Sequence, residues 1–446
     1  MENILLIVLL SLIGISALLL IVRYPFIAAL ILYASVFIDT RDYAFFKVAE
    51  RGLLFVGFGS ALFHWRRRAR KGKKPWRFLV CLMILVLLSA VSMFVNGLEF
   101  NNSAAFVYGE GKIILVLLIF LLYPLNEKEL KTCIWTVVII PVIQIPFLFW
   151  QAMEAGFILP QGMYADYYTG TVGEQSNWKL GLAGISGSGV CLGYLWEPKF
   201  RKNAFLWIVF LYFVSLLVIT DSKTLTAVMI SALMLFSIMR INAPRRFAAG
   251  VRPIARSWIY FYALFSIILL VGAYFFLGPE TMEQLRDVNL AGLAENTNYR
   301  AYEEVTKLNF NSYHSFVFGS GPATTMSSVS ASLMSPFFLR YAGVQDYSQV
   351  SLSISGSGQS TLGAFWGDLG FLGLILYVWI VWCIIRSIDS PSNIDVNEKR
   401  RIVQRIGTFG VIAAIIWGMI GVSFENWLVS VPIGICIGGL ESRSLK

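Results

Sequence analysis

The chain has 446 residues, of which 57% are hydrophobic and only 14% are charged, and its mean hydropathy is +0.69. Soluble domains carry about one quarter charged residues, so this composition predicts an integral membrane protein and excludes an ordinary soluble domain. The net charge of +10 would suggest nucleic-acid binding in a soluble protein, but the basic residues fall in short loops between apolar runs, which is typical of membrane topology.

The apolar residues form separate runs of about 20 residues, and a helix of that length crosses a hydrocarbon core about 30 Å thick. We therefore predict an all-α, polytopic membrane protein with about 12–13 transmembrane helices in a single membrane domain over 1–446. The expected spans are 3–22, 25–39, 44–64, 78–96, 111–125, 133–152, 179–196, 204–220, 223–241, 258–277, 362–386, 406–422 and 425–441.

The basic loops indicate how the chain is oriented. If the spans alternate, the Lys/Arg-rich segments 66–77, 199–202, 242–257 and 399–405 all lie on one side, which the positive-inside rule assigns to the cytoplasm. The opposite side then carries one loop, 278–361, that is far longer than a connection needs. Loops of this size are usually functional, so we expect 278–361 to be external and to cover a cleft.

The long loop contains two recognisable segments. The stretch TNYRAYEEVTKLNF has Tyr299, Tyr302, Val305 and Leu308 at helical spacing, which predicts a short helix at the membrane mouth. The following FGSGPATT segment predicts a tight turn whose exposed backbone amides can receive an anion. The Ser/Gly-rich stretch 351–361 is typical of turns.

Several ionisable residues of this side are candidates for chemistry. Asp221 and Lys223 lie in a short turn between two apolar spans, where charges are costly unless they are paired or used; the alternative is a solvated turn that caps two helices. Arg300, on the expected loop helix, could grip a phosphate, or it could form a salt bridge with Glu303 or Glu304.

The remaining candidates are histidine and aromatic residues. His314 could be a base, although a lone surface histidine is more often idle. The residues expected to stack on sugars are Tyr164, Tyr167, Tyr168 and Trp178, for which an interfacial aromatic belt is the alternative. The five cysteines lie in or beside apolar runs without a CxxC pair or a nearby histidine, so no metal site or disulfide is expected.

Over roughly 165–375 the order of motifs resembles the O-antigen polymerase and ligase family, which are polytopic membrane glycosyltransferases of the C-type fold. The resemblance begins with an upstream Gly-Thr-Val-Gly loop (Gly170–Gly173) followed by Asn177, and with a Ser-cation pair between two spans (Ser222 and Lys223). A basic loop, one span and an arginine helix (Arg300) follow. The last motifs are a Gly-x-Gly stretch (Phe318-Gly319-Ser320-Gly321-Pro322) and a Gly-x-x-Gly-x-x-Gly entry into a span (Gly367, Gly370 and Gly373).

The sequence departs from this family in two places. Lys223 stands where the family more often has arginine, which keeps the charge but loses the bidentate fork. Ligases of the family usually carry a His-Asn pair ahead of the glycine pattern, and this chain has GQSTL over 358–362 instead. The missing histidine favours a polymerase of repeat units over a ligase.

The resemblance implies an enzyme that transfers glycan from a polyprenyl-pyrophosphate donor to an acceptor hydroxyl, at the external face of a bacterial inner (plasma) membrane. It implies Arg300 and Lys223 on the departing pyrophosphate, with Arg340, Gly319 and Gly321 as further contacts. It also implies lipid partners, with a chain-length regulator and a flippase as possible protein partners, and no nucleic acid, cofactor or metal.

Three residues are candidates for the base of this reaction, namely Asp221, His314 and Glu303. Three other functions stay open. A ligase that moves finished glycan shares nearly all these features. A transporter should show ionisable residues or broken helices near the bilayer midplane, and a scaffold should bring a soluble partner domain.

Overall fold

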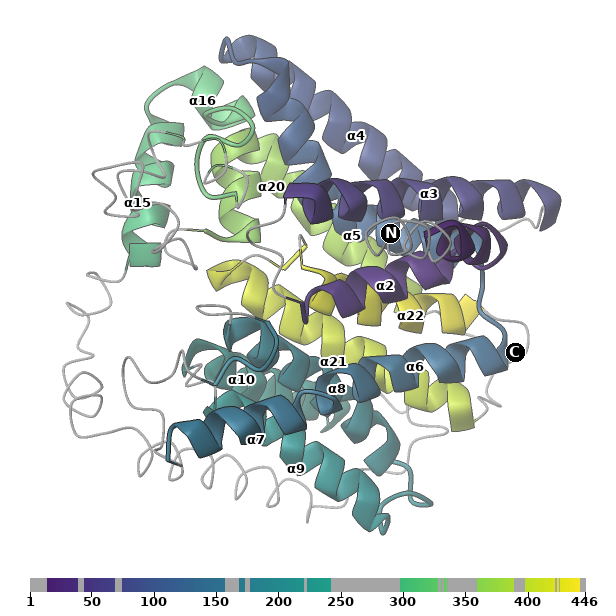
Figure 1. The fold of residues 1–446 in the computed structure, drawn as a ribbon. Helices are drawn as coiled ribbons and strands as arrows, with labels where there is room; N and C mark the ends of the chain where they lie inside the picture. Colours follow the sequence, from purple (N-terminus) through teal and green to yellow (C-terminus); the bar gives the residue numbers. More distant parts are fainter. Residues whose placement is uncertain are drawn as a thin grey trace, which may run out of the picture.

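The computed structural model describes residues 14–38, 44–68, 74–156, 168–172, 177–219, 223–241, 297–327, 330, 333, 335, 359–388, 398–421, 423–424 and 426–441. Within these residues the chain forms helices and no strands, so the predicted all-α class is confirmed (Figure 1). The labelled helices are α2 (Phe26–Ser35), α3 (Ala44–Arg68), α4 (Lys74–Val95), α5 (Phe100–Leu122), α6 (Glu127–Val142), α7 (Ile145–Glu154), α8 (Asn177–Leu195), α9 (Ala204–Ile219), α10 (Lys223–Ile241), α15 (Thr297–Phe310), α16 (Tyr313–Phe318), α20 (Thr361–Ile388), α21 (Glu398–Ile420) and α22 (Trp427–Glu441).

Five helical segments of the described residues are long and apolar enough to cross a membrane. They are Pro75–Val95, Phe100–Leu122, Glu127–Glu154, Thr361–Ile388 and Glu398–Ile420. Their outward faces carry large apolar side chains, such as Met83 (70% exposed) and Phe94 (79%) on α4 and Val378 (58%) on α20. Exposed apolar side chains of this size are compatible with helix faces that meet lipid.

Two helices differ from the expected spans. The span expected at 111–125 begins earlier, at Phe100, because its polar residues Glu110 and Lys112 lie inside the helix and face other helices instead of ending it. The span expected at 133–152 is divided into α6 and α7, with Pro141 in the last turn of α6 and another proline in the first turn of α7. The expected span 258–277 lies outside the described residues.

α20 is also interrupted, although it runs over 28 residues. Gly370 has φ 65° and ψ −152°, which is not helical, so the segment before it and the segment after it are two helical pieces. An interruption leaves backbone groups without helical partners, and in a membrane such groups must be satisfied by neighbouring chain. Both interruptions are indeed contacted by loops, as described below.

The helix ends that bear basic residues gather at one end of the molecule. Lys399 pairs with Glu127, Arg401 lies 3.1 Å from Glu197, and the guanidinium of Arg386 lies over the Trp382 ring. The two ion pairs join the N-terminus of α21 to the N-terminus of α6 and to Glu197, which follows the C-terminus of α8. We call this the basic end.

α15 and α16 lie beside the first part of α20, the opposite end from Arg386 (Figure 1). We call this the loop end. The helix predicted from TNYRAYEEVTKLNF is confirmed as α15, in which Ala301 and Val305 are buried while Leu308 is exposed. The loop end therefore lies against the first part of the interrupted helix α20.

Candidate functional site

The turn after α16 packs into the interruption of α20. Gly319 and Gly321 have positive φ angles of 72° and 107°, as the predicted tight turn requires. The amide of Ser320 donates to the carbonyl of Gly367 (2.8 Å), and the amide of Gly321 donates to the carbonyl of Asp368 (3.1 Å). The turn thus satisfies carbonyls that the interruption leaves without helical partners.

These hydrogen bonds bear on the predicted anion site. The amide of Gly319 donates to the carbonyl of Ser315 at 2.8 Å, and the next two amides donate to α20. The backbone donors of this turn are therefore already engaged within the chain. In this structure the turn fastens α16 to α20, and it does not present open amides to a pyrophosphate.

The side-chain carboxyl of Asp368 is the main acceptor of hydrogen bonds in this region. Its carboxylate is fully buried and accepts from the amides of Ala323 (2.9 Å) and Thr325 (2.7 Å), as well as from the hydroxyl of Thr325. Ala323 has a φ of 58°, which is uncommon for a residue other than glycine. The strained backbone brings both amides onto one carboxylate, so 323–325 is held against α20.

α15 is attached by its own polar contacts. Tyr302 donates to the carbonyl of Met419 on α21 (2.7 Å) and is hydrogen-bonded to the hydroxyl of Ser360, which in turn accepts from the amide of Gly363 (2.8 Å). Burial raises the pKa of Tyr302 to about 12. The phenol is therefore protonated at neutral pH and can act as the donor to Met419.

Further hydroxyl groups continue from this contact into the bundle. The hydroxyl of Thr361 accepts from the amide of Ser423 (2.8 Å) and lies 3.3 Å from the Ser423 hydroxyl. A Cβ atom at Gly418 would lie 2.8 Å from Ser423 Oγ and 3.3 Å from Tyr377 Oη, so these two hydroxyls border the same small space. We define the hydroxyl cluster as Tyr302, Ser360, Thr361, Tyr377 and Ser423.

A second group of polar residues connects α3, α5 and α22. Lys112 on α5 lies 3.6 Å from the carboxylate of Glu50 on α3, and the indole of Trp427 donates to the same carboxylate at 2.6 Å. The Lys112 ammonium also lies over the Tyr108 and Trp427 rings, at 4.9 and 5.0 Å from their centroids. Charges inside a membrane bundle are costly and usually mark functional sites.

Sequence reasoning missed the acids and the cation of this second group. The signal was present, because Glu110 and Lys112 interrupt an otherwise apolar stretch, but the expected span began only after Glu110. Glu110 thus fell outside the expected span, whereas Glu50 and Lys112 lay inside the expected spans 44–64 and 111–125 without a predicted role. The described helix α5 carries Glu110 and Lys112 into the bundle.

The structure describes only part of the predicted catalytic and phosphate-binding set. Asp221 and Arg340 lie outside the described residues, and only the helical backbone is described at Lys223 and Arg300, on α10 and α15. His314 is exposed on α16, beside the Tyr313 ring. Glu303, considered as a base, forms a 2.7 Å salt bridge with Lys307 on the exposed face of α15.

The structure describes two of the four residues that were predicted to stack on sugars, Tyr168 and Trp178. Tyr164 and Tyr167 lie outside the described residues, and Trp178 is partly buried at the start of α8. Tyr168 is only 5% exposed and belongs to the hydrophobic core, so its ring is packed within the protein and does not present a face to a sugar. We therefore leave Tyr168 out of any glycan-binding surface.

The loop that follows Tyr168 satisfies the other interruption. Thr171 donates to the side-chain oxygen of Gln144 through both its amide and its hydroxyl, each at 2.9 Å. The amide of Gly170, at φ 59°, donates to Gln151 at 2.9 Å. Because Gln144 lies in the turn between α6 and α7, this loop is fastened to the break in the expected span.

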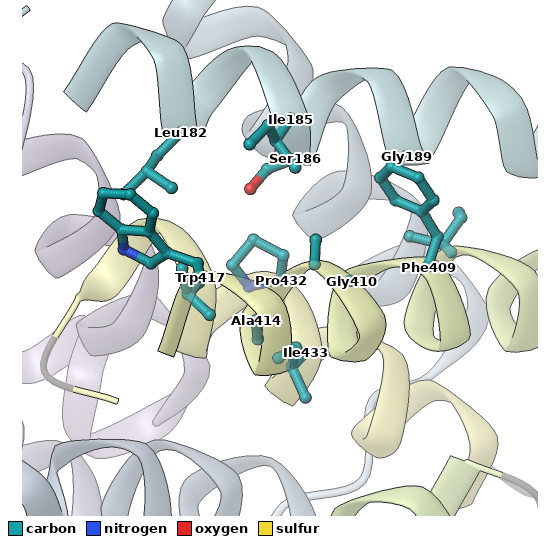
Figure 2. Close-up of a pocket in the computed structure, with 13 residues that line it drawn as sticks. Leu182, Ile185, Ser186, Gly189, Phe409, Gly410, Ala414, Trp417, Pro432 and Ile433 are labelled. Carbon is teal, nitrogen blue, oxygen red and sulfur yellow. The ribbon is translucent and has the colours of Figure 1, made fainter. Parts of the chain in front are cut away.

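An apolar pocket of about 30 Å³ lies between α8, α21 and α22 (Figure 2). Its lining includes Leu182, Phe409, Trp417 and Ile433, and the polar side chain Ser186 donates to the carbonyl of Leu428 at 2.8 Å. Figure 2 shows Trp417 at one limit of the pocket, one residue before Gly418 of the hydroxyl-lined space. The lining suits hydrocarbon and offers little to a polar ligand.

Among the described residues no three His, Cys, Asp or Glu side chains are grouped so that they could hold a metal ion. The five cysteines are buried and free. A comparison with models of known protein families gave no match, and a comparison with curated proteins gave none either.

Proposed function

We propose that this protein is a glycosyltransferase that polymerises lipid-linked oligosaccharide repeat units, at the external face of a bacterial plasma membrane. The donor is glycan joined through pyrophosphate to a polyprenol, and the acceptor is a hydroxyl of a second glycan. The proposed topology has about 12–13 transmembrane helices, with the basic end in the cytoplasm and the long loop 278–361 outside.

One observation carries the proposal, namely the attachment of α15 and the FGSGP turn to an interrupted helix at the end opposite the basic residues. The sequence motifs behind the resemblance are the arginine helix, the Gly-x-Gly turn and the glycine pattern of α20. In the structure these three are contiguous, since Tyr302 contacts Ser360 and Ser320 contacts Gly367. Contiguity is what a shared active site would require.

The chemistry assigned to this end needs cations on the leaving pyrophosphate. We assign that role to Arg300 and Lys223, with Arg340 as a third candidate, because each charge-assisted hydrogen bond to an anion contributes about 1.5–3 kcal/mol. Gly319 and Gly321 keep a positioning role, since their amides are engaged. The polyprenyl chain would lie along apolar helix faces, and the pocket beside Trp417 offers one such surface.

A deletion strain of the native host provides the test. It is complemented at matched membrane levels with wild type, Arg300→Ala or Lys307→Ala, and surface glycans are separated by size. Lys307 is the matched control, because it is an exposed cation two turns further along the same helix and pairs with Glu303. We expect wild type and Lys307→Ala to restore long chains, and Arg300→Ala to leave single repeat units.

Other outcomes would assign a different function. Long chains that remain lipid-linked in the deletion strain would identify a ligase. Repeat units that accumulate on the cytoplasmic side would identify a flippase or transporter. The transporter is the second candidate function. It is supported by the charges of Glu50 and Lys112 and by the interrupted helices α20 and α6–α7, which are features of transporters.

A further inference from the structure

Glu110 is an acid inside the bundle to which the proposed reaction has so far given no role. Its side chain is fully buried on α5, in a segment long and apolar enough to cross a membrane. A carboxylate at such a position is costly, and acids inside membrane helices typically belong to proton or ion pathways. The question is what its surroundings allow it to bind.

The face of α5 that carries Glu110 reaches α20 through a contact between aromatic rings. Phe106, one turn earlier on α5, contacts the Phe365 ring at 6.1 Å, and Phe365 in turn contacts Tyr377 at 5.6 Å. Residues four apart share a helix face, so Glu110 continues this row. Glu110 lies one turn from Phe106, and Tyr377 contacts Phe365, so the two groups flank the same pair of rings.

Tyr377 connects this acid to the hydroxyl cluster. Its side chain is 94% buried, and its hydroxyl has no hydrogen-bond partner among the described residues. It borders, with the Ser423 hydroxyl, the space that Gly418 leaves open. Ser423 contacts Thr361, and Tyr302 lies at the loop end of the same cluster. Hydroxyl groups therefore lead from α15 towards Glu110.

Several other ionisable groups lie on the neighbouring helices and have partners of their own, and none of them belongs to the hydroxyl cluster except Tyr302. On α3 and α5, Glu50 and Lys112 pair with one another, and Arg51 lies over the Tyr108 ring at 5.2 Å. On α20, Asp368 is held by the amides of 323 and 325. Glu110 is the acid on the α5 face that reaches the Phe365 and Tyr377 rings.

We propose that Glu110 and Tyr377 form a proton-binding site inside the membrane bundle, reached from the loop end through the hydroxyl cluster. This inference rests on the proposed function for its role in the reaction. As the acceptor oxygen bonds to the anomeric carbon, the bond from that carbon to the pyrophosphate oxygen breaks and its electron pair leaves with the pyrophosphate. The acceptor's hydroxyl proton passes into the cluster and neutralises the Glu110 carboxylate. After the product leaves, the proton returns to the external solvent.

The first experiment detects the proton directly and needs no substrate. Full-length protein in lipid nanodiscs is titrated while infrared difference spectra record carboxylic acid C=O stretching. We expect a reversible band that Glu110→Gln abolishes and Tyr377→Phe shifts. Tyr212→Phe is the matched control, since this tyrosine bonds the Pro141 carbonyl at 2.7 Å on other helices, and it should leave the band unchanged. A wild-type band that persists in Glu110→Gln would overturn the site.

The second experiment measures transfer with repeat units isolated from the native host on their lipid carrier. Glu110→Gln is isosteric and neutral, and we expect it to lower kcat by about 100-fold at unchanged KM and to flatten the acidic limb of the pH profile. An unchanged rate and profile would refute the role in transfer. If wild type shows the infrared band but never polymerises, the proposed function fails while the proton site stands.

Discussion

Single side chains fasten the loop end to the membrane helices. Asp368 is the clearest case, because a fully buried carboxylate accepts two amides and a hydroxyl from one short stretch of chain. A hydrogen bond contributes about 0.5–1.5 kcal/mol, and a buried acceptor that loses its donors costs about 1–3 kcal/mol, so this one residue fixes 323–325 on α20. Tyr302 performs the same task for α15 with a neutral phenol.

The phenol gives a prediction about pH. The folded pKa of Tyr302, about 12, lies above the ordinary value of about 10, so the fold favours the protonated form. Its contribution to stability is complete below pH 10 and is lost as pH rises from 10 to 12. Tyr302→Phe should cost about 1–3 kcal/mol at pH 7, through the lost bonds to Ser360 and Met419.

Thermal unfolding in detergent, measured as a function of pH, checks this expectation. The difference between wild type and Tyr302→Phe should be constant from neutral pH up to about 9 and then shrink towards pH 12. Taking the difference cancels the titration of groups that both proteins share. A difference that grew with pH would contradict the assignment of the phenol as donor.

At the scale of elements, the two interrupted helices are stabilised in the same way. The 168–172 loop contacts the turn between α6 and α7, and the FGSGP turn contacts the break at Gly370. In each case a loop residue with positive φ, Gly170 or Gly319, makes the close approach. Each break exposes backbone groups that a lipid cannot satisfy, so a loop must accompany it.

Gly319 offers a prediction at this scale. A Cβ atom there would lie 2.5 Å from the Asp368 carbonyl carbon and 2.6 Å from the Gly367 oxygen, both backbone atoms that cannot move aside easily. Gly319→Ala should therefore separate the turn from α20 and expose 318–327 to protease. Gly97→Ala is the matched control, because Gly97 also has a positive φ (64°) but nothing lies within 4 Å of its Cβ position.

Protease protection of the two variants measures the contact alone, since both carry the same backbone strain of roughly 1 kcal/mol. We expect faster cleavage at 318–327 in Gly319→Ala and wild-type cleavage in Gly97→Ala. Equal cleavage in both would mean that the close approach of the turn to α20 does not hold the loop end in place.

At the scale of the whole molecule, charge is separated along the bundle. The ion pairs of Lys399 and Arg401 gather helix termini at the basic end, while α15 and α16 occupy the loop end. Moving a basic cluster across a bilayer is unfavourable, which is the physical origin of the positive-inside rule. The separation therefore makes a definite prediction about sidedness.

Cysteine labelling tests whether the loop end is external and the basic end is cytoplasmic. In a variant that lacks the five native cysteines, Lys307→Cys reports on the loop end and Lys202→Cys on the basic end, and both positions are exposed. A membrane-impermeant maleimide should label Lys307→Cys in intact spheroplasts, and Lys202→Cys only after permeabilisation. Labelling of both from the same side would invalidate the proposed topology.

The sequence by itself determined the all-helical class, the α15 helix and the tight turn at Gly319 and Gly321, because each depends on local spacing or composition. Only the tertiary structure decided which amides of that turn are engaged, that α20 and the span at 133–152 are interrupted, and that Glu110 and Lys112 lie inside the bundle. Hydropathy averages over a window and cannot tell a helix face that meets lipid from one that meets another helix. That distinction is a property of packing, and packing is what buries Glu110.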